Sequence, residues 1–197
     1  IFYSDGNYPS GATSTDSIIT GSSNHKLGNN LVVGDFNADG KADLGVGEIR
    51  ATSEVSFYLF YNDGSYPESD SGNDASFGTS NTSTFTSGFG KAVAVGDFNA
   101  DGRTDIAITS PSCGDGALGG CLDIFYNDGS YGSADVTVFG ETSQSWGDAL
   151  AAGDFDRDGD TDIAVSDFGV SSNTGKAYIL YNDGSYPNAG SADVTIT

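Results

Sequence analysis

The chain has 197 residues, of which 28 are Asp or Glu and 7 are Lys or Arg, so its formal net charge is -21. Such a strong negative charge repels the phosphate groups that DNA- and RNA-binding proteins neutralise, which excludes nucleic acids as expected partners. Gly accounts for 29 residues and Pro for 4, and no apolar run approaches the roughly 20 residues of a membrane helix, so we expect short strands, tight turns and no membrane insertion.

Two sequence motifs alternate along the chain, and together they define a repeat unit of about 60 residues. The first motif, called here the Tyr-rich turn, reads Tyr-Asn-Asp-Gly-Ser-Tyr, with Tyr-Ser-Asp-Gly-Asn-Tyr in its first copy, and occupies residues 3–8, 61–66, 126–131 and 181–186. The second, called the Asp-rich loop, has the pattern Asp-x-[Asn/Asp]-x-Asp-Gly-x-x-Asp and occupies residues 35–43, 97–105 and 154–162.

The first 26 residues contain only half a unit. Apolar runs at residues 1–3 and 18–20 flank the first Tyr-rich turn and correspond to the last two strands of the later units. Because the chain contains no Met and begins at Ile1, we expect it to be a processed product or a piece of a longer protein.

Each complete unit, spanning residues 27–87, 88–143 and 144–197, is predicted to form a four-stranded antiparallel sheet. The Asp-rich loop joins the first two strands, and the Tyr-rich turn joins the last two, where Gly supplies the positive φ of a tight hairpin. The predicted fold is therefore a single all-β domain of about three and a half sheets. The expected strands are residues 31–33, 44–46, 55–61 and 83–86, then 92–95, 106–108, 122–126 and 136–139, then 149–152, 163–165, 177–181 and 194–196.

The Asp-rich loops have the composition of calcium-binding loops. Ca²⁺ binds six to eight oxygens, and a short loop provides them from alternate side chains when a Gly at position six allows a sharp turn. Positions one, three, five and nine would donate side-chain oxygens, and position seven its backbone carbonyl. Three Ca²⁺ sites are thereby predicted: Asp35, Asn37, Asp39, Lys41 and Asp43; Asp97, Asn99, Asp101, Arg103 and Asp105; and Asp154, Asp156, Asp158, Asp160 and Asp162.

Two other interpretations of these loops fit less well. An EF-hand needs a bidentate Glu at position twelve and a helix on each side, whereas position twelve here is Val46, Ile108 or Val165 and the flanking segments are strand-like. A solvated turn without metal would leave carboxylates close together, at a cost of about 1 kcal/mol per pair even in water.

Cys113 and Cys121 enclose a Gly-rich loop without His. We expect a disulfide, with two free thiols as the alternative, and a disulfide favours an oxidising compartment. A zinc site from this pair alone is disfavoured because closed zinc sites use four ligands. The sequon at residues 81–83 is compatible with glycosylation at the surface of a secreted protein.

The units resemble the FG-GAP repeats of integrin α-subunit propellers. Phe89-Gly90 matches the Phe-Gly of that family, Trp146-Gly147 and Leu27-Gly28 hold the equivalent positions, and Ser110-Pro111 retains part of the later Gly-Ala-Pro element. The resemblance implies a β-propeller of four-stranded antiparallel blades, with Ca²⁺ between the first and second strands of a blade and ligands on the opposite or upper rim. Integrin propellers have seven blades, so this chain would form a partial one.

From these patterns we expect a non-catalytic, calcium-stabilised structural or adhesion module, secreted or at the cell surface, with a protein or glycan as its partner. His25, the only histidine, lies in a polar stretch and is expected to be exposed rather than catalytic. Three alternatives stay open: a lectin that binds sugars at the Tyr-rich turns around Asp63, Asp128 and Asp183; a homo-oligomer or filament joined through open sheet edges, or a fragment of a seven-bladed propeller; and a glycosidase with paired Asp residues.

Overall fold

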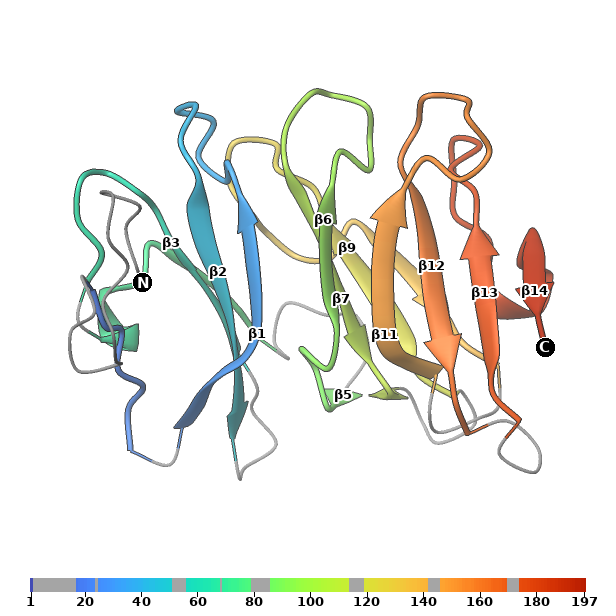
Figure 1. Cartoon of the computed structure of the whole chain (residues 1–197), viewed down its shortest axis with the longest axis horizontal. Helices are drawn as coiled ribbons and strands as arrows, with labels where there is room; N and C mark the ends of the chain where they lie inside the picture. The colour runs from blue at the N-terminus through green and yellow to red at the C-terminus, as the bar shows by residue number, and fades with distance from the viewer. Residues whose placement is uncertain are drawn as a thin grey trace.

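The computed structural model describes residues 1, 17–23, 25–50, 56–67, 69–78, 86–113, 119–141, 146–169 and 174–197. The strands of these described residues form three four-stranded sheets and one two-stranded sheet, all antiparallel (Figure 1). The helical elements of the described part are two single-turn 3-10 helices, η2 (Asp70–Gly72) and η5 (Ala189–Ser191). The predicted all-β class is confirmed. Within the described ranges, no helix has the length and apolar character needed to cross a lipid bilayer.

The first blade contains β1 (His25–Gly34), β2 (Asp43–Arg50), β3 (Ser56–Phe60) and β4 (Ala75–Gly78), paired in chain order. Its fourth strand was expected at residues 83–86, and this prediction was wrong. The chain returns earlier because Asp74 closes the hairpin: its N–H donates to the Leu59 carbonyl, and its carboxylate accepts the Tyr61 N–H. Phe77 then points into the core with 1% of its surface exposed.

The second blade pairs β6 (Val93–Gly96), β7 (Asp105–Ser110), β9 (Cys121–Phe125) and β10 (Val136–Phe139). The third pairs β11 (Trp146–Gly153), β12 (Asp162–Asp167), β13 (Lys176–Leu180) and β14 (Val194–Ile196). Every strand predicted for these two units overlaps an observed strand. The small sheet pairs β5 (Thr86–Ser87) with β8 (Ser112–Cys113), and Cys113 forms the expected disulfide with Cys121, with Cα atoms 5.7 Å apart.

The three blades stand side by side, and the first strand of the second blade, β6, lies between the first strands of the other two, β1 and β11 (Figure 1). This is the arrangement of successive blades in the predicted β-propeller. The two larger hydrophobic clusters of the described residues lie between the blades. The one between the first and second contains Phe36, Phe57, Leu59, Phe77, Phe89, Ile106, Ile108 and Phe125, and the one between the second and third contains Phe98, Leu122, Ile124, Val138, Trp146, Ile163, Val165, Tyr178 and Leu180.

The half unit before the first blade is described only in part. Ile19 packs against Val46, Tyr58 and Phe60 on the outer face of the first blade, and Asp70 accepts hydrogen bonds from the backbone and hydroxyl of Ser22, both at 2.7 Å. The Tyr-rich turn at residues 3–8, the sequon at residues 81–83 and the side chain of His25 lie outside the described residues. The division into a half blade and three blades at residues 26, 87 and 143 stays a prediction.

Candidate metal centre

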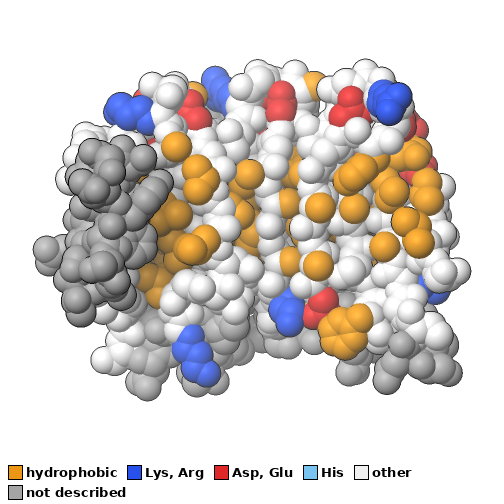
Figure 2. All heavy atoms as spheres, viewed as in Figure 1, with side chains coloured by type: hydrophobic (Ala, Val, Ile, Leu, Met, Phe, Trp, Pro, Cys, Tyr) orange, Lys and Arg blue, Asp and Glu red, His pale blue; other side chains and the backbone are white. Residues whose placement is uncertain are grey.

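The three Asp-rich loops lie along one edge of the molecule. They connect β1 to β2, β6 to β7 and β11 to β12, and because these first strands run in the same direction, all three loops come to the upper edge in Figure 1. Acidic and basic side chains gather along this edge, while apolar side chains are scattered over the face below it (Figure 2). The predicted metal loops are thus equivalent positions in successive blades.

The backbone of each loop has a positive φ at two positions. Position four has a positive φ of 59°, 59° and 72° in Ala38, Ala100 and Arg157, and position six has a positive φ of 83°, 84° and 99° in its glycines. A side chain added at Gly40 or Gly102 would meet no atom within 4 Å, so the conformation and not the space requires glycine there. A non-glycine residue with this φ costs of order 1 kcal/mol or more, and such strain is concentrated at functional sites.

Side-chain oxygens at positions one, three and five turn into the loop and accept its backbone N–H groups. In the first loop Asp35 accepts from Asp39 at 3.0 Å and from Gly40 at 2.9 Å, while Asn37 also accepts from Asp39 at 3.0 Å. The second loop repeats these bonds through Asp97 and Asn99. The short side chains of the first two loops therefore turn toward the backbone of their own loop.

Position nine ties each loop to the blade. Asp43, Asp105 and Asp162 expose 1%, 0% and 0% of their surface. In Asp105, one carboxylate oxygen accepts the Phe98 N–H at 2.8 Å and the other accepts the Asn127 N–H at 2.7 Å. Burial raises the pKa of Asp105 above its ordinary value, although these two hydrogen bonds offset part of the increase. Asp43 and Asp162 make the equivalent pairs of bonds.

The carboxylates converge most closely in the third loop. One oxygen each from Asp154, Asp156 and Asp162 lies within 4.8 Å of the others, and a second such group joins Asp156, Asp158 and Asp183. Among the described residues, these two are the groups in which three Asp, Glu, His or Cys side chains bring ligand atoms within 4.8 Å of one another. The structure therefore brings four of the predicted third-site residues together and adds Asp183, which the sequence analysis had placed in a turn.

The Tyr-rich turns support the loops from the same blade. The second tyrosine of each turn donates its hydroxyl to the carbonyl of position eight: Tyr66 to Ala42 at 3.1 Å, Tyr131 to Thr104 at 2.6 Å, and Tyr186 to Thr161. Burial raises the pKa of Tyr131 and Tyr186 well above the ordinary value for tyrosine. These hydroxyls, which the lectin alternative would use for a sugar, already hold the loop.

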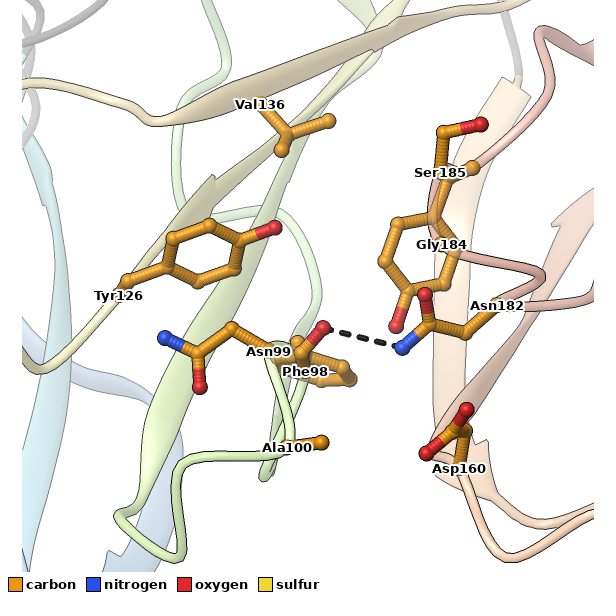
Figure 3. A pocket seen from close by; sticks show the side chains of 10 residues that line it. Phe98, Asn99, Ala100, Tyr126, Val136, Asp160, Asn182, Gly184 and Ser185 are labelled. Carbon is orange, nitrogen blue, oxygen red and sulfur yellow. Dashed lines mark hydrogen bonds between the residues drawn. The ribbon is translucent and has the colours of Figure 1, made fainter.

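The asparagine of the turn connects neighbouring blades. The side-chain amide of Asn127 donates to the Phe36 carbonyl in the first loop at 3.0 Å, and that of Asn182 donates to the Phe98 carbonyl in the second loop at 3.0 Å (Figure 3). Sequence reasoning missed this contact because it joins residues that are 91 and 84 positions apart. The first and second loops are therefore each held by their own blade and by the following one.

A pocket lies beside each of these contacts. The one between the second and third blades has a volume of about 360 Å³ and is lined by Asn99, Tyr126, Asp160 and Ser185 among others (Figure 3). The one between the first and second blades has a volume of about 220 Å³ and is lined by the residues at the same repeat positions, including Arg103 in place of Asp160. The position-seven side chain thus gives the two pockets opposite charge.

Comparison with known proteins identifies related sequences. Residues 89–118 and 146–180 match the FG-GAP repeat family, and each matched segment contains one Asp-rich loop. The chain is 33% identical over 154 residues to phosphatidylinositol-glycan-specific phospholipase D of Rattus norvegicus, an alignment that covers 72% of this chain and 18% of that protein. It is 36% identical over 85 residues to integrin alpha-7 of Homo sapiens, covering 41% of this chain and 7% of that protein.

Proposed function

The chain carries FG-GAP repeats, as its sequence motifs predicted, and on this premise we propose that it is an extracellular, non-catalytic structural or adhesion module whose three Asp-rich loops each bind one Ca²⁺ ion. The observation that carries the proposal is the same oxygen-lined loop in three successive blades, with carboxylate oxygens within 4.8 Å of one another in the third. Repeated loops of this kind, placed at one edge, suit a set of stabilising ions rather than a single reaction centre.

The donor atoms fit a hard cation. The predicted ligands of all three loops are carboxylate, amide and backbone carbonyl oxygens, without sulfur or imidazole nitrogen, which is the donor set of Ca²⁺. Position nine would bind while it keeps its hydrogen bonds to backbone N–H groups, because a carboxylate oxygen has more than one lone pair. The residues that would hold the ions are those at positions one, three, five and nine of each loop, with the carbonyls of Lys41, Arg103 and Asp160.

Calcium bound there would stabilise the contact between blades as well as the loop. Position nine is buried in the blade, and the next blade's asparagine bonds to the carbonyl that follows position one. An ion that fixes the loop therefore favours the assembled blades over separated ones. Bound ions also reduce the self-repulsion of a chain with a formal charge of -21.

The compartment and the partner follow from the same features. The disulfide fits an oxidising environment, and extracellular calcium modules bind with dissociation constants of about 10⁻⁴ to 10⁻³ M, close to the calcium levels found outside cells. We assign the partner to the proteins or glycans of the cell surface. The chain spans less than a fifth of the phospholipase relative, so that protein's activity is not carried over to this one.

The stoichiometry of calcium binding tests the proposal. Native mass spectrometry of the calcium-free chain titrated with Ca²⁺ is expected to show three bound ions, because three loops provide the donor set. The variant Asp97→Ala should bind two, since position one of the second loop is lost while the other loops are unchanged. A wild-type chain that retains no calcium, or an Asp97→Ala variant that still binds three ions, would contradict the proposal.

A further inference from the structure

The third Asp-rich loop differs from the other two in charge. The first loop contains three aspartates and Lys41, and the second contains three aspartates and Arg103. The third contains five aspartates and Arg157, because Asp156 replaces an asparagine at position three and Asp160 replaces a basic residue at position seven. The side chain of Arg157 is exposed, as are those of Lys41 and Arg103, so the third loop differs from the other two in charge by its two additional aspartates.

The basic residues at position seven place a positive charge beside the first and second loops. In the first loop the Lys41 ammonium forms an ion pair with the carboxylate of Asp39 at 2.9 Å and donates to the Asn62 carbonyl at 3.0 Å. In the second loop the Arg103 guanidinium donates to the Asn127 carbonyl at 3.2 Å. An incoming cation must displace or tolerate these positive charges, which weakens its binding.

The Tyr-rich turn of the third blade adds a carboxylate instead. One oxygen of Asp183 lies within 4.8 Å of oxygens of Asp156 and Asp158. Asp156 also belongs to the group formed with Asp154 and Asp162, so the turn approaches the loop's own ligands directly. Among the described residues, the equivalent aspartates of the first and second blades, Asp63 and Asp128, belong to no such group of three.

Resting on the proposed calcium function, we propose that the third loop binds Ca²⁺ more tightly than the other two and that Asp183 contributes its carboxylate to this site. The affinity of oxygen-ligand loops for calcium depends on the number of charged ligands. One carboxylate about 5 Å from a doubly charged ion changes the affinity by about tenfold even at the dielectric constant of water. The three sites are thus not equivalent, and the third loop takes up its ion at a lower calcium concentration than the other two.

Residue-specific calcium titration by NMR tests the proposal, because each loop carries its own reporter, the amide of the position-six glycine. Calcium-free protein labelled with ¹⁵N is titrated with CaCl₂, and the midpoints of Gly40, Gly102 and Gly159 are compared. We expect Gly159 to respond at about one tenth of the calcium concentration needed by the other two. In Asp183→Asn the Gly159 midpoint should rise about tenfold, while Gly40 and Gly102 keep theirs.

The matched control is Asp128→Asn, which changes the same turn position in the second blade. It should leave the Gly159 midpoint within about twofold of the wild type, since Asp128 lies in the Tyr-rich turn of the second blade and not beside the third loop. Midpoints that coincide for the three glycines, or an Asp183→Asn variant with an unchanged Gly159 midpoint, would overturn the inference while leaving the calcium function standing. If none of the three glycines responds to calcium, the proposed function itself fails and this inference fails with it.

Discussion

Replacing Asp105 by Ala is expected to lower the free energy of unfolding by about 4 kcal/mol, because its two carboxylate oxygens accept buried backbone donors. Asp105 is fully buried, and the N–H groups of Phe98 and Asn127 donate to it at 2.8 and 2.7 Å. Without an acceptor, each buried donor costs roughly 1–3 kcal/mol. Urea unfolding followed by circular dichroism in calcium-free buffer measures this loss separately from the loss of a metal site.

The control for this prediction is Asp97→Ala, which removes position one of the same loop. Its carboxylate accepts N–H groups of exposed loop residues only, and water can replace it there. In calcium-free buffer this variant is expected to lose about 1 kcal/mol or less. Equal losses for Asp97→Ala and Asp105→Ala would show that position nine does not connect the loop to the blade in the way described.

The second large effect is expected for Phe98→Ala, which should lower the free energy of unfolding by about 3–5 kcal/mol. Phe98 exposes 1% of its surface and packs between the second and third blades, where its ring meets Tyr186 edge to face with centroids 6.3 Å apart. Truncation leaves a cavity between two blades that are held by other contacts, so the site cannot collapse fully. Chemical denaturation in saturating calcium gives the relevant value.

Phe155 provides the matched control for Phe98 because it occupies the same position in the third loop. It exposes 44% of its surface, and no described residue of a following blade covers it. We therefore expect Phe155→Ala to cost less than half as much as Phe98→Ala, about 1–2 kcal/mol. A loss as large as that of Phe98→Ala would mean that Phe155 is covered in solution, as in the oligomer alternative.

The repeated motifs predicted most of the fold because they encode local geometry. Gly at position six and in the Tyr-rich turns permits the positive φ that these turns need. The short apolar segments on either side of the turns have the length and composition of strands. The second and third blades accordingly match the expected strands. In the first blade the last strand was misplaced because the signal that ends the hairpin is Asp74, whose carboxylate holds the Tyr61 N–H. Asp135 and Asp193 do the same in the other blades.

The contacts that link the loops to other segments were harder to predict because they depend on how blades pack. The Asn127 and Asn182 amides reach the preceding blade, and no local pattern distinguishes this role from that of an ordinary turn residue. Asp183 approaches the third loop only once the blade is folded. A comparison of the repeats offers one sequence signal that the third site differs from the other two. The third loop has Asp at positions three and seven, where the other loops have Asn and a basic residue.

The most direct test of the account is thermal unfolding of the intact chain with calcium and after chelation, with Mg²⁺ at equal ionic strength as the control for charge screening. Three sites at a calcium concentration tenfold above their dissociation constants contribute about 4 kcal/mol, which raises the Tm of a chain of this size by about 10 °C. We expect chelation to remove this increase and Mg²⁺ not to restore it. A Tm that is the same with calcium, with Mg²⁺ and with chelator would contradict the claim that the Asp-rich loops are calcium sites that stabilise the blades.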